Sequence, residues 1–314
     1  MTKIFLALGG NAILGSKEKG TFKEQFKNIR NISGQIVQLI MDGHQVLITH
    51  GNGPQVGALL LQQDESKNIA PEQPLDVLDA MTQGQIGYMI QLALQNEMKR
   101  NDIKKSVVTL INMVEVDESD PAFDDPTKPV GPFYTYKEAR KLALLKEWNI
   151  KKVLENRKDG YRHVVPSPTP IRNNEVDVVR LLLENGVIVI ASGGGGIPVS
   201  AGKGALKGVE AVIDKDMAGE LLAEEVGCDV LMLLTDIEKV KLNFGKDDET
   251  DLDILTISEA EDYMSKGHFP PGSMGPKIRA ATRFISRGGS LAVISSIDKI
   301  MESYEGKTGT RIIK

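Results

Sequence analysis

The sequence of 314 residues predicts an α/β protein, a three-layer αβα sandwich with a mostly parallel open sheet and a small inserted, protruding subdomain. Short apolar runs without polar alternation recur along the chain, and strands that are buried on both faces have this pattern. Amphipathic stretches with helical spacing separate the runs, as in chains whose helices cover both faces of a parallel sheet. One proline-rich region interrupts this order and is expected to protrude.

The predicted strands are short apolar runs that end in polar residues or glycine. The first covers residues 4–8 and is followed by Gly9 and Gly10. The later ones cover residues 45–50, 106–111, 187–192, 229–235 and 290–296. Their continuous apolar character predicts that both faces of the sheet are covered.

The predicted helices fall between these strands. The first covers residues 21–42, where Thr21 and Glu24 match a capping box and Gly43 fits the helix end. Further helical patterns cover residues 79–100, 174–185, 217–226 and 276–287. We interpret residues 1–314 as a single domain.

Residues 117–170 depart from this pattern and are expected to form an inserted subdomain, a lid over the substrate side. Prolines stand at positions 121, 126, 129 and 132, and a short helix is expected at 136–147. Asp159 and Gly160 lie between two strand-like pieces, and an Asp-Gly pair is a hairpin signal. The alternative is a long surface loop.

Composition excludes several classes of protein. The net charge of −5 argues against a nucleic-acid-binding protein, which would be basic. Cys228 is the single cysteine and the four histidines are scattered, so neither a disulfide nor a metal-binding spacing is expected. No segment approaches the roughly 18 apolar residues of a membrane span. We therefore expect a cytoplasmic protein with no membrane partner.

Glycines follow three of the predicted strands. They stand at 9–10, at 51 and 53, and at 193–196, with Pro54 placed to start a helix. One glycine after a strand usually marks only a turn. Parallel strands, however, bring their carboxyl ends to one edge, where ligands bind. The three clusters together predict a cleft in which helix amides face an anion.

Charged residues that could complete an anion site come later in the chain. Asp214, Lys215 and Asp216 precede a predicted helix, and Lys277 falls in the first turn of another. Asp216 could equally be a helix N-cap. A lysine in a first turn opposes the helix dipole, so Lys277 is easier to explain if phosphate binds there. Lys215 could be a solvated surface residue and Lys128 an exposed loop lysine.

Several blocks together resemble the carbamate kinases of the amino acid kinase superfamily, and this resemblance spans essentially the whole chain. The blocks are ALGGNA, THGNGPQVG, DPTKPVGPFY, VIASGGGGIPV, VIDKDMAGE, GSMGPK and EGKTGTRI. Relatives such as acetylglutamate kinase usually carry a lysine beside the first glycine loop. Ala7 and Leu8 show that this chain lacks that lysine, as carbamate kinases do. The resemblance implies the amino acid kinase fold.

The resemblance also implies where the missing charge comes from. Lys215 and Lys277 would hold the transferred phosphoryl group between them, Asp216 would orient both lysines, and Lys128 would reach down from the inserted subdomain. These four residues are the expected catalytic residues. The expected phosphate-binding residues are Gly9, Gly10, Asn11, Gly193, Gly194 and Gly195.

The remaining roles concern the two substrates. By similarity, Gly51, Asn52 and Gly53 would face carbamate. The expected nucleotide-binding residues are Asp214, Thr235, Asp236, Met274 and Gly275. Asp214 would help to place Mg²⁺ with ATP or ADP, and no residues are assigned to a separate metal site.

The implied reaction is ATP + carbamate ⇌ ADP + carbamoyl phosphate with Mg²⁺. The sequence does not reveal its physiological direction, and a biosynthetic role would make carbamoyl phosphate. Arginine fermentation would use it to make ATP. Two alternatives stay open: a kinase of another small acid or phosphate in the same superfamily, and a catalytically silent nucleotide sensor. A homodimer is expected from the family, with the apolar helix at 81–94 as a candidate face or, equally, as an ordinary core helix.

Overall fold

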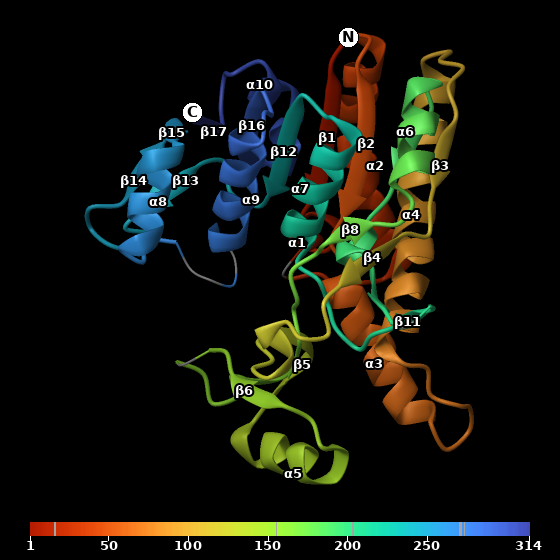
Figure 1. Ribbon diagram of the computed structural model, residues 1–314, viewed down its shortest axis with the longest axis vertical. Coiled ribbons are helices and arrows are strands. Elements are labelled where there is room, and N and C mark those ends of the chain that lie inside the picture. Colours follow the sequence, from red (N-terminus) through yellow and green to blue (C-terminus); the bar gives the residue numbers. More distant parts are fainter. Residues whose placement is uncertain (16, 155, 203, 270–271, 273) are drawn as a thin grey trace.

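The structure is a computed structural model that describes residues 1–15, 17–154, 156–202, 204–269, 272 and 274–314. Among these residues, eight strands form the main sheet in the order β15-β17-β16-β12-β1-β2-β9-β3 (Figure 1). In that order the strands are Ile254–Thr256, Thr310–Ile313, Leu291–Ser296, Val230–Thr235, Lys3–Leu8, Gln45–His50, Ile188–Ile190 and Val107–Thr109. The predicted α/β class and mostly parallel sheet are confirmed.

The register of the central strands determines where the site can form. β1 is parallel to β2 and to β12, and its last residue, Leu8, lies opposite His50 and Leu234. Three neighbouring strands therefore end at the same level of one sheet edge. Of the pairings described in this sheet, only that between β16 and β17 is antiparallel.

Helices cover both faces of the sheet, as the apolar strands predict. The helices are α1 (Gly10–Ile13), α2 (Phe22–Met41), α3 (Gly53–Ser66), α4 (Leu75–Arg100), α5 (Tyr136–Lys146), α6 (Val176–Glu184), α7 (Lys215–Val226), α8 (Ile257–Ser265), α9 (Met274–Ser286) and α10 (Ile300–Tyr304). Short 3₁₀ turns are η1 (Pro121–Phe123), η2 (Gly193–Gly195) and η3 (Ile297–Lys299). The Thr21–Glu24 capping box opens α2 as predicted.

The side chains of β1 divide between two apolar cores because successive strand residues point to opposite faces. Leu6 and Leu8 pack with residues of α2 and α4 in one core. Phe5 and Ala7 pack with residues of α7 and α9 in the other. All four are fully buried, so the strand is fixed from both sides. None of the described helices is both long and apolar enough to cross a bilayer.

Residues 117–170, which are predicted to form the inserted subdomain, carry a separate antiparallel sheet in the order β5-β7-β6 (Lys128–Tyr134, Tyr161–Val165, Ile150–Lys152). In Figure 1, β5, β6 and α5 extend away from the main sheet. A second small sheet, β11-β10-β4-β8, joins this part to the body (Leu206–Gly208, Ile197–Ala201, Met113–Val116, Arg172–Asn173). β13 (Val240–Leu242) pairs with β14 (Thr250–Leu252) near α8.

The inserted subdomain rests on α3 through a close backbone approach. A Cβ atom on Gly57 of α3 would lie 3.1 Å from backbone atoms of Gly131 on β5. Lys146, at the end of α5, forms an ion pair with Asp64 of α3. These contacts hold the start of β5 above the edge where the central strands end.

Candidate active site

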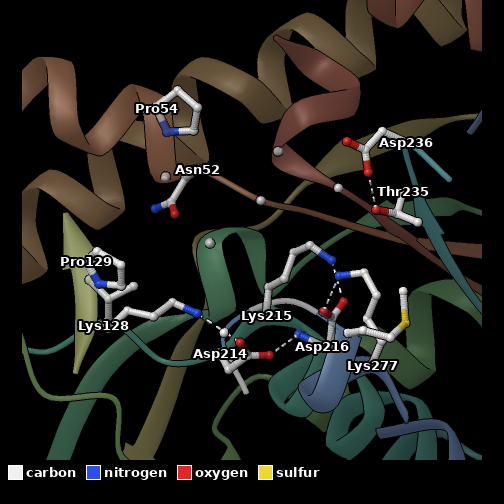
Figure 2. A pocket seen from close by; sticks show the side chains of 18 of the residues that line it. Asn52, Pro54, Lys128, Pro129, Asp214, Lys215, Asp216, Thr235, Asp236 and Lys277 are labelled. Carbon is white, nitrogen blue, oxygen red and sulfur yellow. Dashed lines mark hydrogen bonds and ion pairs between the residues drawn. The ribbon is translucent and has the colours of Figure 1, made fainter. Parts of the chain in front are cut away.

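A pocket of about 460 Å³ opens where β1, β2 and β12 end (Figure 2). It brings together most of the residues that the sequence analysis selected. These are Gly9, Gly10, Gly51, Asn52, Gly53, Lys128, Gly194, Asp214, Lys215, Asp216, Thr235, Asp236, Met274 and Lys277. They come from the ends of β1, β2 and β12, from η2, from the first turns of α7 and α9, and from the start of β5. The parallel sheet places the strand ends side by side.

The first two glycine clusters allow the backbones at the ends of β1, β2 and β12 to approach each other closely. The Gly9 amide donates to the Leu234 carbonyl at 2.8 Å, and the Gly51 amide donates to the Leu8 carbonyl at 2.9 Å. A Cβ atom on Gly51 would lie 2.8 Å from the Gly10 nitrogen, which is closer than real Cβ atoms come. Glycine at position 51 therefore allows the two strand ends to meet beneath the pocket.

Four predicted site residues do not join this set. Gly193 and Gly195 do not line the pocket, because their backbones pack against the His50 ring and the Ile213 carbonyl. Of that glycine run only Gly194 faces the pocket, with a left-handed φ of 71°. Gly275 is buried within α9 and is also absent from the lining. The side chain of Asn11 lies outside the described residues.

The helix that carries two of the site residues begins earlier than predicted. α7 starts at Lys215 rather than at residue 217, and Asp214 is its N-cap. The Asp214 side chain accepts hydrogen bonds from the Asp216 amide at 3.0 Å and the Met217 amide at 3.4 Å. The N-cap interpretation of Asp216 is therefore wrong. Because Asp214 caps the helix, the Asp216 carboxylate is available for the two lysines.

Asp216 joins Lys215 and Lys277 into one charged cluster (Figure 2). Lys277 Nζ lies 2.8 Å from Asp216 Oδ2, and Lys215 Nζ pairs with Asp216 Oδ1. The Asp216 side chain is 4% exposed and each lysine side chain 12%, so water screens these charges little. α9 brings Lys277 to the cluster from a position 61 residues along the chain.

The pKa values in this cluster follow from burial and from charge pairing. Burial opposes ionisation of Asp216, but the two ammonium groups hold its pKa well below the usual range. Burial lowers the pKa of Lys215, and the Asp216 carboxylate only partly offsets that effect. Burial also favours a lower pKa for Lys277, but the Asp216 carboxylate outweighs that effect and raises the pKa of Lys277. The cluster thus contains an ionised carboxylate between cationic groups.

Lys128 reaches the opposite side of the pocket from the inserted subdomain. It is the first residue of β5, not a loop residue as its spacing suggested. Its Nζ lies 2.8 Å from Asp214 Oδ2, with 31% of the Lys128 side chain exposed. Burial disfavours the charged form of Asp214, but Lys128 prevails and lowers the pKa of that carboxyl.

Neither residue that precedes the first glycine loop could supply a cation. The side chains of Ala7 and Leu8 are fully buried in the two apolar cores. An ammonium group at either position would lie among aliphatic side chains, where an unpaired charge is strongly unfavourable. The lysines of the pocket instead come from four other elements, α7, α9, β5 and β13.

One end of the pocket lies beside Thr235, Asp236 and Met274. The Thr235 hydroxyl donates to Asp236 Oδ1 at 3.0 Å. The sequence analysis missed five residues of the lining here: Ile237, Lys241, Phe244, His268 and Phe269. Phe244 is 68% exposed although its ring borders the pocket. An isolated aromatic in an acidic loop carries no periodic signal, so sequence alone could not select it.

The arrangement suits chemistry on anions. Four lysines and the N-terminus of α3 line one cavity. The described residues contain no cluster of histidine, cysteine or acidic side chains that could by itself hold a metal ion. Lysines, glycine-rich strand ends and helix N-termini around one pocket are typical of enzymes that transfer phosphoryl groups. The fold and the site together define a phosphotransferase.

Comparison with known proteins gives the family. Residues 2–296 match the amino acid kinase family. A carbamate kinase from Thermococcus kodakarensis is 53% identical over 100% of both chains, and one from Pyrococcus horikoshii is 52% identical over 99% of this chain and 98% of that one. The structure of a Giardia lamblia carbamate kinase bound to AMP-PNP covers 100% of this chain and 98% of its own, with 42% identity and a TM-score of 0.92. The chain belongs to the amino acid kinase family, among its carbamate kinases.

Proposed function

We propose that this chain catalyses ATP + carbamate ⇌ ADP + carbamoyl phosphate. The observation that carries the proposal is the Lys215–Asp216–Lys277 cluster, which lies against the glycine-rich ends of the central strands. A carbamate oxygen bonds to the γ-phosphorus while the bond from that phosphorus to the bridging oxygen of ADP breaks. Carbamate is already an anionic nucleophile, so the reaction needs no general base.

Positioning and charge neutralisation then supply the catalysis. Lys215 and Lys277 hold the transferred phosphoryl group, and the amides of Gly10 and Gly194 approach its oxygens. The Gly9 amide is already bonded to the Leu234 carbonyl, so Gly9 serves by bringing the backbone close. Asp216 keeps the two ammonium groups at a fixed separation. Support comes from the burial of this cluster, because electrostatic interactions are stronger where water is excluded.

The test of the proposed function is a coupled assay for ATP formation from MgADP and carbamoyl phosphate. Turnover at a rate well above that with other acyl phosphates is the expected result. No ATP formation by folded protein that binds MgADP would overturn it. That outcome would instead favour the catalytically silent nucleotide sensor.

We propose Mg²⁺ as the metal that accompanies the nucleotide. Asp214 and Asp216 are carboxylates at the pocket, and Mg²⁺ typically binds one or two carboxylates together with substrate phosphates. When bound, the ion would neutralise phosphate charge. Both carboxylates are already held by lysines, so the protein alone offers no complete cage.

Removing Mg²⁺ should stop turnover without unfolding the protein. We expect excess chelator to abolish ATP formation, because the nucleotide loses its counter-charge, and added Mg²⁺ to restore it. The thermal midpoint of the nucleotide-free protein should not change. A large drop in that midpoint would mean that a metal ion stabilises the fold, contrary to the proposal.

The inserted subdomain is proposed to be a lid over the acyl substrate. Lys128, Pro129 and Val130 of this segment line the pocket, and the Gly57–Gly131 approach anchors it to α3. Gly51, Asn52 and Gly53 would lie beneath carbamate, while Thr235, Asp236 and Met274 would contact the nucleotide. Phe244 and Phe269 provide apolar surface at that end of the pocket, which suits a nucleobase.

Lys128→Ala should weaken use of the acyl substrate. We expect the KM for carbamoyl phosphate to rise about 10- to 100-fold, since a hydrogen bond to a charged group is lost. The Kd for MgADP should stay within about twofold, because Lys128 lies away from the nucleotide end. Steady-state kinetics and nucleotide titration measure the two effects. Lys137→Ala, at an exposed position of α5, is the matched control. Loss of nucleotide affinity with an unchanged KM would contradict the lid assignment.

We also propose a cytoplasmic homodimer. Most apolar side chains of α4 are buried in the chain's own core, but Met81 and Tyr88 are 44% and 58% exposed. Ile111 lies beside Tyr88 and is 53% exposed, which extends the apolar surface. Sedimentation equilibrium should give twice the chain mass, and Tyr88→Glu should lower it toward the monomer.

An arginine-degrading role that makes ATP remains part of the proposal.

A further inference from the structure

Two residues of α4 accept hydrogen bonds from the Asn52 side chain. Asn52 Nδ2 donates to Asp79 Oδ1 and to Thr82 Oγ1, both at 2.9 Å. All three residues are at least 97% buried. Both protons of the amide nitrogen are therefore already used, and Asn52 has no further hydrogen to offer a substrate.

The partners also determine which way the amide faces. The Thr82 hydroxyl donates its own proton to the Asp79 carbonyl at 2.7 Å, so toward Asn52 its oxygen can only accept. Asp79 Oδ1 also accepts. Burial raises the pKa of Asp79, but a carboxyl protonated on Oδ2 still accepts through Oδ1. Reversing the amide would place its oxygen against these two oxygens.

The side-chain carbonyl oxygen of Asn52 consequently faces the pocket, where it can accept a hydrogen bond. Figure 2 shows the amide with its oxygen on the side of Lys215 and its nitrogen on the far side. No hydrogen bond to Asn52 Oδ1 is present among the described residues. Gly194 keeps the space open, because a Cβ atom there would lie 2.3 Å from Nδ2 and 3.0 Å from Oδ1.

We propose that Asp79 and Thr82 are positioning residues that turn Asn52 Oδ1 toward the substrate, so that the pocket selects an acyl group carrying N–H over one carrying a methyl group. This inference rests on the proposed function. The carbamate nitrogen delocalises its lone pair into the carboxylate, so its NH₂ group only donates. An acetyl group of similar size would cover the same oxygen and leave it unpaired. Leaving a buried acceptor unpaired should weaken binding of the acyl group by roughly 5- to 100-fold.

A purely structural role explains Asp79 poorly. Its second oxygen, Oδ2, is buried and has no hydrogen-bond partner among the residues that the structure describes. A buried polar atom without a partner lowers stability, and an apolar side chain of the same shape would avoid that cost. The acid is understandable if its purpose is to fix the neighbouring amide. Asp79→Leu should accordingly leave the thermal midpoint unchanged or higher.

The experiment compares carbamoyl phosphate with acetyl phosphate as phosphoryl donors to MgADP. In each case the acyl O–P bond breaks, ADP gains the phosphoryl group, and carbamate or acetate leaves. The quantity measured is the ratio of the two kcat/KM values in the full chain. Where acetyl phosphate turns over too slowly, its inhibition constant replaces its kcat/KM. We expect Asp79→Leu to lower the ratio about tenfold, chiefly through poorer use of carbamoyl phosphate, because the amide can then rotate.

Three further variants make the result decisive. Asp79→Asn keeps an acceptor oxygen and should retain most of the selectivity. Thr82→Val removes the other acceptor and should lower the ratio, and it decides the question if Asp79→Leu does not fold. Asp76→Leu removes a carboxyl from the same helix with no hydrogen bond to Asn52 and should leave the ratio unchanged.

The outcomes separate the inference from the function on which it rests. If the wild-type chain forms no ATP from carbamoyl phosphate, the proposed function fails. If it does form ATP but Asp79→Leu and Thr82→Val keep the wild-type ratio, only the positioning role is overturned. Equal loss with both donors would likewise assign Asp79 to structure rather than to selectivity.

Discussion

Lys215→Met is expected to lower kcat by about 100- to 1000-fold, the usual effect of removing one group that stabilises charge in a transition state. Methionine keeps much of the length of the side chain but removes the ammonium group. The fold should remain stable because Asp216 retains Lys277 as a partner at 2.8 Å. Pre-steady-state measurement of ATP formation from carbamoyl phosphate would locate the defect in the chemical step.

A matched lysine variant separates this effect from a general change of charge. Lys207→Met alters an exposed residue of β11 and should leave kcat unchanged. MgADP affinity and the thermal midpoint should be similar in the two variants. Near wild-type turnover by Lys215→Met would refute the idea that this lysine replaces the cation absent from positions 7 and 8.

Asp216→Asn is expected to affect both activity and stability. The substitution removes the charge that separates Lys215 from Lys277 while preserving the shape of the side chain. Two buried ammonium groups would then repel each other, so we expect kcat to fall about 100-fold. Breaking a buried ion pair by removing one partner typically costs about 3–5 kcal/mol of unfolding free energy. Chemical denaturation monitored by circular dichroism would measure this loss.

The pH dependence of that loss has a definite sign. The folded-state pKa of Asp216 lies below its unfolded value, so its carboxylate stabilises the protein above about pH 4. This contribution disappears as the pH falls toward the folded pKa. The difference between wild type and Asp216→Asn should therefore be constant near neutral pH and shrink below about pH 4. A difference that grows on acidification would contradict the ionised state assigned here.

Glu224→Gln is the control for Asp216→Asn. Glu224 lies on the same helix, and its ion pair with Arg287 is partly exposed, at 34% and 44% of the two side chains. Exposed pairs typically contribute about 0–1 kcal/mol. Its removal should leave kcat unchanged and stability nearly so.

The sequence predicted the fold well because burial on both faces of a parallel sheet leaves a local pattern. Continuous apolar runs located the central strands, and the strand-end rule brought Gly9 and Gly51 to one edge, while Thr235 was named only through the family resemblance. The residues at which helices begin were harder to predict. Asp214 and Asp216 both suit a helix N-cap, and only the contacts in the structure distinguish the cap from the charge partner.

The rest of the site depends on contacts that no local pattern encodes. Lys128 and Asp214 are 86 residues apart, and Asn52 and Asp79 are 27 apart. Four consecutive glycines likewise look alike in sequence. Packing against His50 and Ile213 decides which of them can face the pocket, and it leaves Gly194 in that place.

The pairing of Lys128, Lys215 and Lys277 with carboxylates means that the site contains its own counter-ions. Lys128 lies against Asp214, while Lys215 and Lys277 share Asp216, so the five side chains carry a net charge of only one. An incoming anion must exchange places with an internal carboxylate rather than meet a bare cation. Chloride gains little binding free energy from that exchange, because one lysine only trades its carboxylate partner for another single negative charge. A phosphoryl group that engages two lysines at once gains more, so the paired charges protect the site from the salt of its surroundings.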